Sequence, residues 1–577
     1  MIQAFSLDPS SLALWCDQET LGKLASKESL MEAVSACLFD TSDVVERAVS
    51  LLPHEDDKRL VRRLAGTIWH EQRHFLDLML TNYGAFRVRQ FLTLYVNMGH
   101  LFGAVRSGGD TLVCPLDAYL DPVRRHLLGI DHVPEGVQQI AKEARDRESM
   151  VRNERQAIPF AGQNLAFGGD AQLEALGFLF QQGAVSNIFG ADAFADLEGT
   201  LPHVERNNLR YRWIFLVADA LGLTRESSEG RVDVDAAFLG ALLIAGLASR
   251  RWGQEQSHTA DGLGSGYCAQ RLKGLFETLK KMSVEPFQDP SKSWEQVNEA
   301  ARLTFGRTVV EEMREDYARE EKWLGQVLAL PGLSENVSLV CKDYHVLRGR
   351  LLKLFEEGPL FFTDPLHYSF GLVSNLKPIT IMSAPGGVLG KTPKGWDMVS
   401  GYQEAGSSSA EGFWWWSSTP SEPEREEQTL ALTQWKAWIE IIEWRAPIAK
   451  LLMKGRAHRT QFGPELIAAE MRLKAGGTEI RFDPLFAFPR DMRVESSAFF
   501  LLTGKAQAVC DVCRSNVLQG SGWILSPWLF RKHTRLAQQA IEALGGGEIG
   551  RLKFIRDWSV WLVCDVCDAK WRPLTEN

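Results

Sequence analysis

The sequence lacks any apolar run long enough to cross a membrane. The longest run, from Phe238 to Ala248, is about half the length that a bilayer-spanning helix needs. The first residues also lack the basic start and the apolar core of a secretory signal peptide. These two absences predict a cytoplasmic protein without a membrane partner.

Cysteine and positive charge are also scarce. The nine cysteines are an odd number, and five of them stand alone in the sequence, so no disulfide framework is indicated. The net charge of -9 argues against a protein that coats nucleic acid or a membrane surface. An apolar content of 45% and a charged content of 24% are typical of a folded soluble protein. A chain of 577 residues predicts roughly two to four domains.

The most informative stretch is His70-Glu71-Gln-Arg-His74. It lies among apolar residues, and no Pro or Gly interrupts the chain from Thr67 to Leu80, so the segment is predicted to be helical. Two histidines four residues apart project from one face of a helix and can occupy two corners of a tetrahedral zinc site. Glu71 then lies close enough to act on a water held by the metal. The alternative is an amphipathic core helix whose histidines are hydrogen-bonded.

This segment resembles the HExxH zinc metallopeptidases, the zincins. The resemblance implies a catalytic zinc held by His70 and His74, with Glu71 as the catalytic residue. The sequence departs from the family at Arg73, where an uncharged residue is usual. Asp77, seven residues after His70, falls on the same helix face and is predicted to orient a ligating imidazole from behind.

An HExxH pair needs a third protein ligand from elsewhere in the chain. In the gluzincin branch this ligand is a Glu on a later helix, and Glu174 fits, because it is a lone carboxylate in the predicted apolar helix 171–181. Asp170 is the expected N-cap of that helix. The competing interpretation of Glu174 is an exposed first-turn carboxylate favoured by the helix dipole. The other candidate ligands are His100, Glu205 and His258.

Two further features of a zincin cleft have candidates. Such a cleft often adds a Tyr or His that stabilises the oxyanion, and His258, His203, Tyr211 and Tyr83 are the candidates. Zincins also lay an edge strand across the cleft, a role for which the predicted strand 110–115 is the candidate.

The expected fold class is a mainly α N-terminal metallopeptidase-like domain over residues 1–360, followed by an α+β C-terminal region. Residues 1 to about 55 are expected to be helical. Residues 361–428 are predicted to be a connector with loops, rich in Gly, Pro and Ser, with the three tryptophans 414–416 on a loop. The Gly-Lys-Thr at 390–392 does not make a phosphate-binding loop, because Pro385 and Pro393 break the pattern.

The C-terminal region, 429–577, contains two Cys-Asp-Val-Cys segments. Together they offer four thiolates to one metal, which predicts a closed structural zinc site resembling a zinc ribbon. The four ligands are Cys510, Cys513, Cys564 and Cys567. Basic residues near this module are too few to favour nucleic acid, so a protein partner is the more natural expectation.

The sequence thus predicts an intracellular, selective or regulated zinc peptidase with one catalytic and one structural zinc, acting on a protein or peptide substrate. Two alternatives remain open. One is a non-catalytic zinc-binding protein that recognises a protein partner through the four-cysteine module. The other is a zinc hydrolase that cleaves a small amide or ester.

Overall fold

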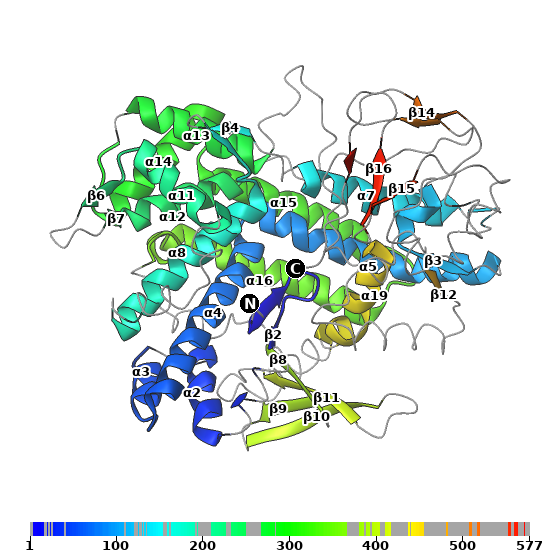
Figure 1. Ribbon diagram of the computed structural model, residues 1–577, viewed down its shortest axis with the longest axis horizontal. Helices are drawn as coiled ribbons and strands as arrows, with labels where there is room; N and C mark the ends of the chain where they lie inside the picture. The colour runs from blue at the N-terminus through cyan, green and yellow to red at the C-terminus, as the bar shows by residue number, and fades with distance from the viewer. Residues whose placement is uncertain are drawn as a thin grey trace. The chain divides into compact units, whose positions relative to one another are not determined.

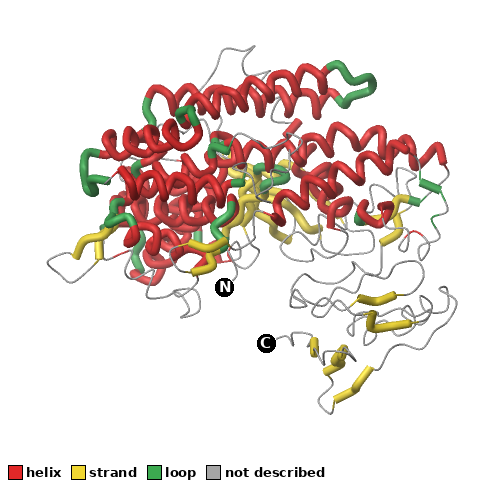
Figure 2. The backbone as a smooth tube through the Cα atoms, turned by 90° about the horizontal axis from the view of Figure 1, so that it is seen from above, coloured by secondary structure: helices red, strands yellow, loops and turns green. Residues whose placement is uncertain are grey.

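The computed structural model describes the chain in segments. These are residues 4–16, 20, 23–24, 27–39, 42–108, 111–120, 125, 130, 132–133, 135–153, 158–160, 163–190, 193, 209–226, 232–249, 267–282, 284–365, 380–385, 388–392, 395–403, 410–416, 437–438, 440–454, 480–482, 507–509, 516–519, 552–555, 559–563 and 570–571. The described residues are mainly helical (Figure 2), as the sequence predicts for the N-terminal region. None of the described helices is both long and apolar enough to cross a membrane.

The chain forms two compact units whose boundaries differ from the predicted ones. The first unit contains Met1–Val96 and Glu148–Ile442, and the second contains Asn97–Arg147 and Glu443–Asn577. Both are therefore built from two separate stretches of chain. The predicted boundaries follow changes of composition, and such changes do not report which distant segments pack together.

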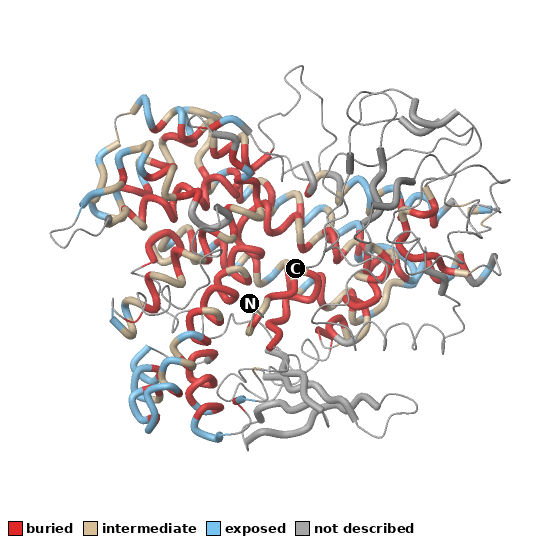
Figure 3. The backbone as a smooth tube through the Cα atoms, in the orientation of Figure 1, coloured by how far each residue is buried: buried red, intermediate tan, exposed pale blue. Residues whose placement is uncertain are grey.

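Helices form most of the first unit (Figure 1). They are α2 (Glu28–Phe39), α3 (Ser42–Ser50), α4 (Glu55–Leu80), the start of α5 (Asn82–Gly108), the end of α7 (Glu135–Asn153), α8 (Gly169–Phe189), α11 (Leu209–Ala220), α12 (Ala236–Leu247), α13 (Cys268–Met282), α14 (Pro290–Phe305), α15 (Val309–Leu328), α16 (Glu335–Glu357) and α17 (Leu360–Thr363). Helix α4 packs against α2, α8 and α16 and against the first strand, β1. It therefore lies inside the unit, as its largely buried trace in Figure 3 shows.

Polar contacts hold α4 near its middle and just beyond its C-terminal end. The indole N–H of Trp69 donates to Cys37 O (3.1 Å) and the Gln72 amide donates to Leu38 O (3.0 Å). These two bonds satisfy carbonyls in the last turn of α2, which have no partner within their own helix. Just beyond the C-terminal end of α4, the side-chain amide of Asn82 donates to Ala248 O and Glu312 O. The metal-ligand candidates on α4 thus stand on a firmly held helix.

A buried group of charges braces the same region, and we call it the arginine network. It consists of Arg89 on α5, Asp316 and Glu320 on α15, and His345 and Arg348 on α16. Each arginine contacts both carboxylates at 2.7–3.0 Å. Arg348 also donates from Nε to Met79 O in the last turn of α4 (3.1 Å). Charges this deeply buried persist because they are paired.

The first unit also contains a six-stranded sheet, which the sequence analysis did not predict. Its order is β1 (Phe5–Asp8), β2 (Ala13–Cys16), β8 (Thr380–Pro385), β11 (Ala410–Trp416), β10 (Gly395–Gln403) and β9 (Val388–Thr392), and β11 also pairs with β9. Two short hairpins, β4 (Ile158–Phe160) with β5 (Gln163–Leu165) and β6 (Thr224–Glu226) with β7 (Val232–Val234), complete the unit's strands in the described part of the chain.

Two predictions about this part of the chain were therefore wrong. The stretch before residue 17 forms the antiparallel β1–β2 hairpin instead of a helix, and the tryptophans 414–416 lie in strand β11 instead of on a loop. Short apolar runs do not distinguish a strand from a helix by periodicity. Between 361 and 428, the Gly, Ser and Pro residues that indicated a connector obscured segments of high strand propensity.

The second unit contains the rest of α5 and most of α7, with β3 (Leu112–Cys114), the 3₁₀ helix η1 (Leu116–Leu120), most of the π-helical turn η3 (Ile441–Arg445) and α19 (Ala446–Lys454). Strand β3 pairs in parallel with β12 (Ile480–Phe482). The remaining strands are β13 (Gln507–Val509) with β14 (Asn516–Gln519), and β15 (Leu552–Ile555), β16 (Ser559–Val563) and β17 (Lys570–Trp571). The strand predicted at 110–115 thus exists, but its pairing partner belongs to this unit.

Candidate metal centre

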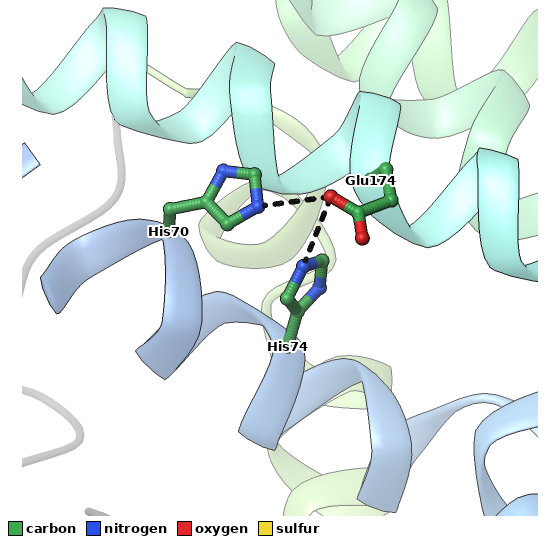
Figure 4. A group of neighbouring side chains, drawn as sticks. All are labelled: His70, His74 and Glu174. Atoms are coloured by element: carbon green, nitrogen blue, oxygen red, sulfur yellow. Dashed lines mark ion pairs between the residues drawn. The ribbon is translucent and has the colours of Figure 1, made fainter. Parts of the chain in front are cut away.

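Two adjacent helices bring the three predicted ligands together (Figure 4). His70 and His74 lie one turn apart on α4, and Glu174 lies in the second turn of α8. The Glu174 carboxylate oxygen Oε2 is 3.4 Å from Nε2 of His70 and 3.8 Å from Nε2 of His74. The imidazole rings meet edge to face, with centroids 4.5 Å apart. We call these three side chains the ligand cluster.

The spacing of these atoms fits a tetrahedral zinc ion. Zinc holds nitrogen and carboxylate oxygen at about 2.0–2.2 Å, which places two ligand atoms of a tetrahedron about 3.3 Å apart. One ligand atom from each residue of the cluster lies within 4.8 Å of the other two. Two imidazoles and one carboxylate are also the donor set of many catalytic zinc sites, with a fourth position left for water.

The electrostatics of the cluster favour a bound cation. Burial alone would lower the pKa of His74, but the hydrogen bond and charge of Glu174, helped by Glu71 and Asp77, raise it from 6.5 to about 9. Burial would also raise the pKa of Glu174, yet the two histidines hold it well below its usual range. Glu174 is therefore ionised at neutral pH and favours positive charge on His74.

Close packing between α4 and α8 sets the position of His70. Gly177 on α8 lies against the His70 ring, so that a Cβ atom at this position would be 2.9 Å from Cε1 and 3.1 Å from both ring nitrogens. Gly66 on α4 faces α8 in the same way, where a Cβ would meet Gln181 at 3.0 Å. Glycine at these two positions allows the helices to approach closely enough for the three ligands to meet.

Glu71, the predicted catalytic residue, is buried on α4 with 3% of its surface exposed. Its Oε2 accepts a hydrogen bond from the backbone N–H of Leu7 in strand β1 (2.8 Å). Glu71 is also close enough to contribute by its charge to the raised pKa of His74. Leu7 was not among the predicted site residues, because a backbone amide from a distant strand leaves no signal in the residue pattern.

Asp77 has a different partner from the predicted one. Its carboxylate accepts hydrogen bonds from Nε and Nη2 of Arg73 at 2.7–3.0 Å, and both side chains are completely buried. In the described part of the chain, the buried Nδ1 of His74 has no hydrogen-bond partner. Asp77 therefore makes no hydrogen bond that orients this imidazole, because the four-residue spacing pairs it with Arg73.

The pairing with Asp77 also accounts for the unexpected charge of Arg73. Besides this ion pair, Arg73 donates to Phe362 O of α17 (2.8 Å) and lies over the Phe180 ring of α8, 3.8 Å from its centroid. A charged residue is thus tolerated between the two histidines because its charge is paired and its donors are hydrogen-bonded.

Helix α8 begins slightly earlier than predicted. Its N-cap is Gly168, so Asp170 lies in the first turn and not at the cap. The Asp170 carboxylate accepts hydrogen bonds from Tyr83 (2.5 Å) and Arg87 (2.8 Å) of α5. Tyr83, one of the oxyanion candidates, is therefore engaged in holding α5 to α8.

Several predicted site residues lie outside the described residues. These are His203, His258, Glu205 and the four cysteines Cys510, Cys513, Cys564 and Cys567. The backbone of Tyr211 lies in α11, but its side chain is also outside the described part. His100 is an exposed residue of α5 and is not a member of the ligand cluster.

The chain was compared with protein-family models, with curated proteins and with solved structures. No family model, no curated protein and no solved structure matches it.

Proposed function

We propose that this protein is a zinc-dependent peptidase in which His70, His74 and Glu174 hold the metal and Glu71 is the general base. The observation that carries the proposal is the convergence of these three ligand side chains from α4 and α8. Two of them were predicted from the spacing of the HExxH segment. The third stands 100 residues after His74 and meets them only through the packing of two helices.

The reaction proposed for the site divides the work between metal and protein. When bound, zinc would polarise a carbonyl group and acidify a water molecule. Glu71 would accept a proton from the attacking water at its carboxylate as the water oxygen bonds to the scissile carbonyl carbon. It would then deliver this proton to the amine nitrogen as the C–N bond breaks. His70 and His74 donate neutral nitrogen ligands, so the proton on His74 must leave as the metal binds.

Peptide as the substrate class, and the cytoplasm as the location, rest on the sequence. The resemblance of residues 64–80 to the zincins favours peptide bonds over small amides or esters. We retain the four C-terminal cysteines as a proposed structural zinc site, which would bring the chain to two zinc ions.

One observation favours the rival function, a non-catalytic zinc-binding protein. Glu71 is buried and holds the Leu7 amide, which a purely structural carboxylate would also do. The two functions differ in one respect: a peptidase needs Glu71 even when zinc is bound, whereas a zinc-binding protein needs only the ligands.

The first test measures zinc per chain in the wild type, in His70→Ala and in the double variant Cys510→Ser/Cys513→Ser. We expect about two zinc ions in the wild type and about one in each variant. Wild type and Glu71→Gln are then compared on a peptide library, where we expect Glu71→Gln to keep its zinc and to lose roughly 10²- to 10⁴-fold in rate. Full hydrolysis by Glu71→Gln would overturn the peptidase mechanism.

A further inference from the structure

The contact between strand β1 and Glu71 extends the candidate site to the start of the chain. Leu7 and Glu71 are 64 residues apart, and their hydrogen bond joins a backbone amide to a side chain. Both residues are buried, with 7% of Leu7 and 3% of Glu71 exposed. The bond is therefore shielded from water, which strengthens its hold on the carboxylate.

Side-chain hydrogen bonds hold the turn of the hairpin that carries Leu7. In the turn between β1 and β2, the Asp8 carboxylate accepts hydrogen bonds from the backbone N–H of Ser10 (3.1 Å) and from the hydroxyls of Ser10 and Ser11 (2.7 Å each). The Tyr95 hydroxyl donates to the Ser10 carbonyl. These buried contacts hold the amide of Leu7 in a fixed position.

The direction of the Leu7 amide follows from the strand pairing. Leu7 stands opposite Leu14 of β2, and in an antiparallel pair the N–H groups point alternately toward the partner strand and away from it. Because the Leu7 N–H reaches Glu71, it points away from β2, while those of Ser6 and Asp8 point toward it. Strand β1 also stands at one end of the sheet order. The contact with Glu71 therefore takes no bond from the sheet.

We propose that the backbone amide of Leu7 is a positioning group for Glu71. A hydrogen bond on Oε2 fixes the plane of the carboxylate, and with it the direction in which Oε1 is presented to the reacting water. A backbone amide suits this task, since it has no rotamers and does not titrate in the working range. This inference rests on the proposed function, because it assigns a role in the reaction of that same site.

The test removes the amide hydrogen without removing a sheet bond. Proline at position 7 has no N–H, and at this position it costs no bond to β2. The matched control is Leu7→Ala, which shortens the side chain but keeps the donor. With zinc bound, we expect Leu7→Pro to lower kcat by roughly 10- to 100-fold with KM and zinc content unchanged. The kcat of Leu7→Ala measures the cost of the shortened side chain alone, and we expect the kcat of Leu7→Pro to lie at least about tenfold below it.

A second measurement needs no catalysis and no proline. Hydrogen exchange at single-residue resolution is compared between wild type and Glu71→Ala, both loaded with zinc. We expect the Leu7 amide to exchange at least about tenfold faster in Glu71→Ala, while the Ser6 amide, which faces β2, keeps its protection. Unchanged protection of Leu7 would overturn the inference, even if Leu7→Pro did not fold.

The outcomes separate this inference from the proposed function. Full hydrolysis by Glu71→Gln would remove the general base and with it the role of Leu7. Loss of hydrolysis in Glu71→Gln together with a normal kcat in Leu7→Pro would leave the peptidase intact and overturn the positioning role alone.

Discussion

Two largely buried groups of ionisable side chains lie on α4 or contact it, and they balance their charges in different ways. In the arginine network, Arg89 and Arg348 contact both Asp316 and Glu320, so that two fixed positive charges meet two negative ones. In the ligand cluster, Glu174 faces two imidazoles, whose positive charge must come from protons or from a bound cation. The network is complete as the chain folds, whereas we expect the ligand cluster to respond to pH and to metal.

The largest effect is expected from neutralising the carboxylate of the ligand cluster. Glu174→Gln keeps the shape of the side chain but removes its charge. Zinc affinity typically falls roughly 10- to 100-fold when a hydrogen-bond partner of a metal ligand is lost, and we expect a larger fall here because a ligand itself is changed. Competition with a chromophoric chelator measures this affinity. Lys353→Gln, which changes an exposed charge on α16, is the control. Wild-type affinity in Glu174→Gln would exclude Glu174 as a ligand.

Breaking the arginine network should lower the free energy of unfolding equally with and without zinc. Arg348→Ala leaves Asp316 and Glu320 with one arginine between them, and removing one partner of a buried ion pair typically costs about 3–5 kcal/mol. We expect the free energy of unfolding of the first unit to fall by this amount, both with zinc and with a chelator. Urea denaturation followed by circular dichroism measures it.

The control for this prediction is Arg314→Ala. Arg314 pairs with Glu356 between the same two helices, α15 and α16, but its side chain is 61% exposed. An exposed pair contributes roughly 0–1 kcal/mol. If Arg348→Ala were no more harmful than Arg314→Ala, the arginine network would not be the brace that we describe.

The stability of the metal-free protein and its affinity for zinc should change with pH in opposite directions. The pKa of His74 is raised from 6.5 to about 9, so without metal its proton stabilises the fold fully below about pH 6.5, and this contribution is lost as pH rises through about 9. Zinc must displace this proton, so zinc affinity should rise about tenfold for each pH unit below 9 and level off above it.

Calorimetry in two buffers of different ionisation enthalpy measures this linkage directly. We expect about one proton to be released per zinc ion from His74 at pH 7.5, and fewer in a His74→Ala variant under the same conditions. No proton release in the wild type would mean that His74 is already neutral at this pH and that Glu174 does not keep His74 protonated.

The site was more predictable than the fold around it, for physical reasons. His70, Glu71 and His74 belong to one helix, so their arrangement follows from helical periodicity alone. Glu174 was one of four candidate third ligands, favoured by the resemblance to the gluzincins and because a carboxylate in an apolar helix needs a counter-charge. The partner of Asp77 was missed because two satisfactory partners, an arginine and a histidine, stood at helical spacing, and the sequence did not indicate which was chosen.

The sheet shows what local patterns leave out. Strand β2 pairs with β8, so that Leu14 lies opposite Thr380, and the intervening residues include almost every helix of the first unit. A pairing over so long a separation depends on the packing of the whole unit and leaves no periodic signal nearby. The same holds for Leu7 and Gly177, because their contacts with Glu71 and with the His70 ring join segments that are distant in the sequence.

The smallest effect is expected from a single methyl group on α8. Gly177→Ala places a Cβ 2.9–3.1 Å from three atoms of the His70 ring, closer than ordinary van der Waals contact, so that the ring must turn or the helices must separate. Either movement disturbs the position of Nε2 relative to Glu174. We expect zinc affinity to fall by roughly tenfold, the lower end of the range for groups that support a metal ligand.

The matched control is Gly103→Ala on α5, where a Cβ would meet nothing within 4 Å. Both substitutions exchange glycine for alanine inside a helix, which by itself favours the helix by up to about 1 kcal/mol. Gly103→Ala should therefore leave zinc affinity unchanged, and the difference between the two variants isolates the steric effect at His70. If Gly177→Ala bound zinc as tightly as Gly103→Ala, the His70 ring would not need the close approach of α4 and α8, and the ligand cluster would be looser than its spacing indicates.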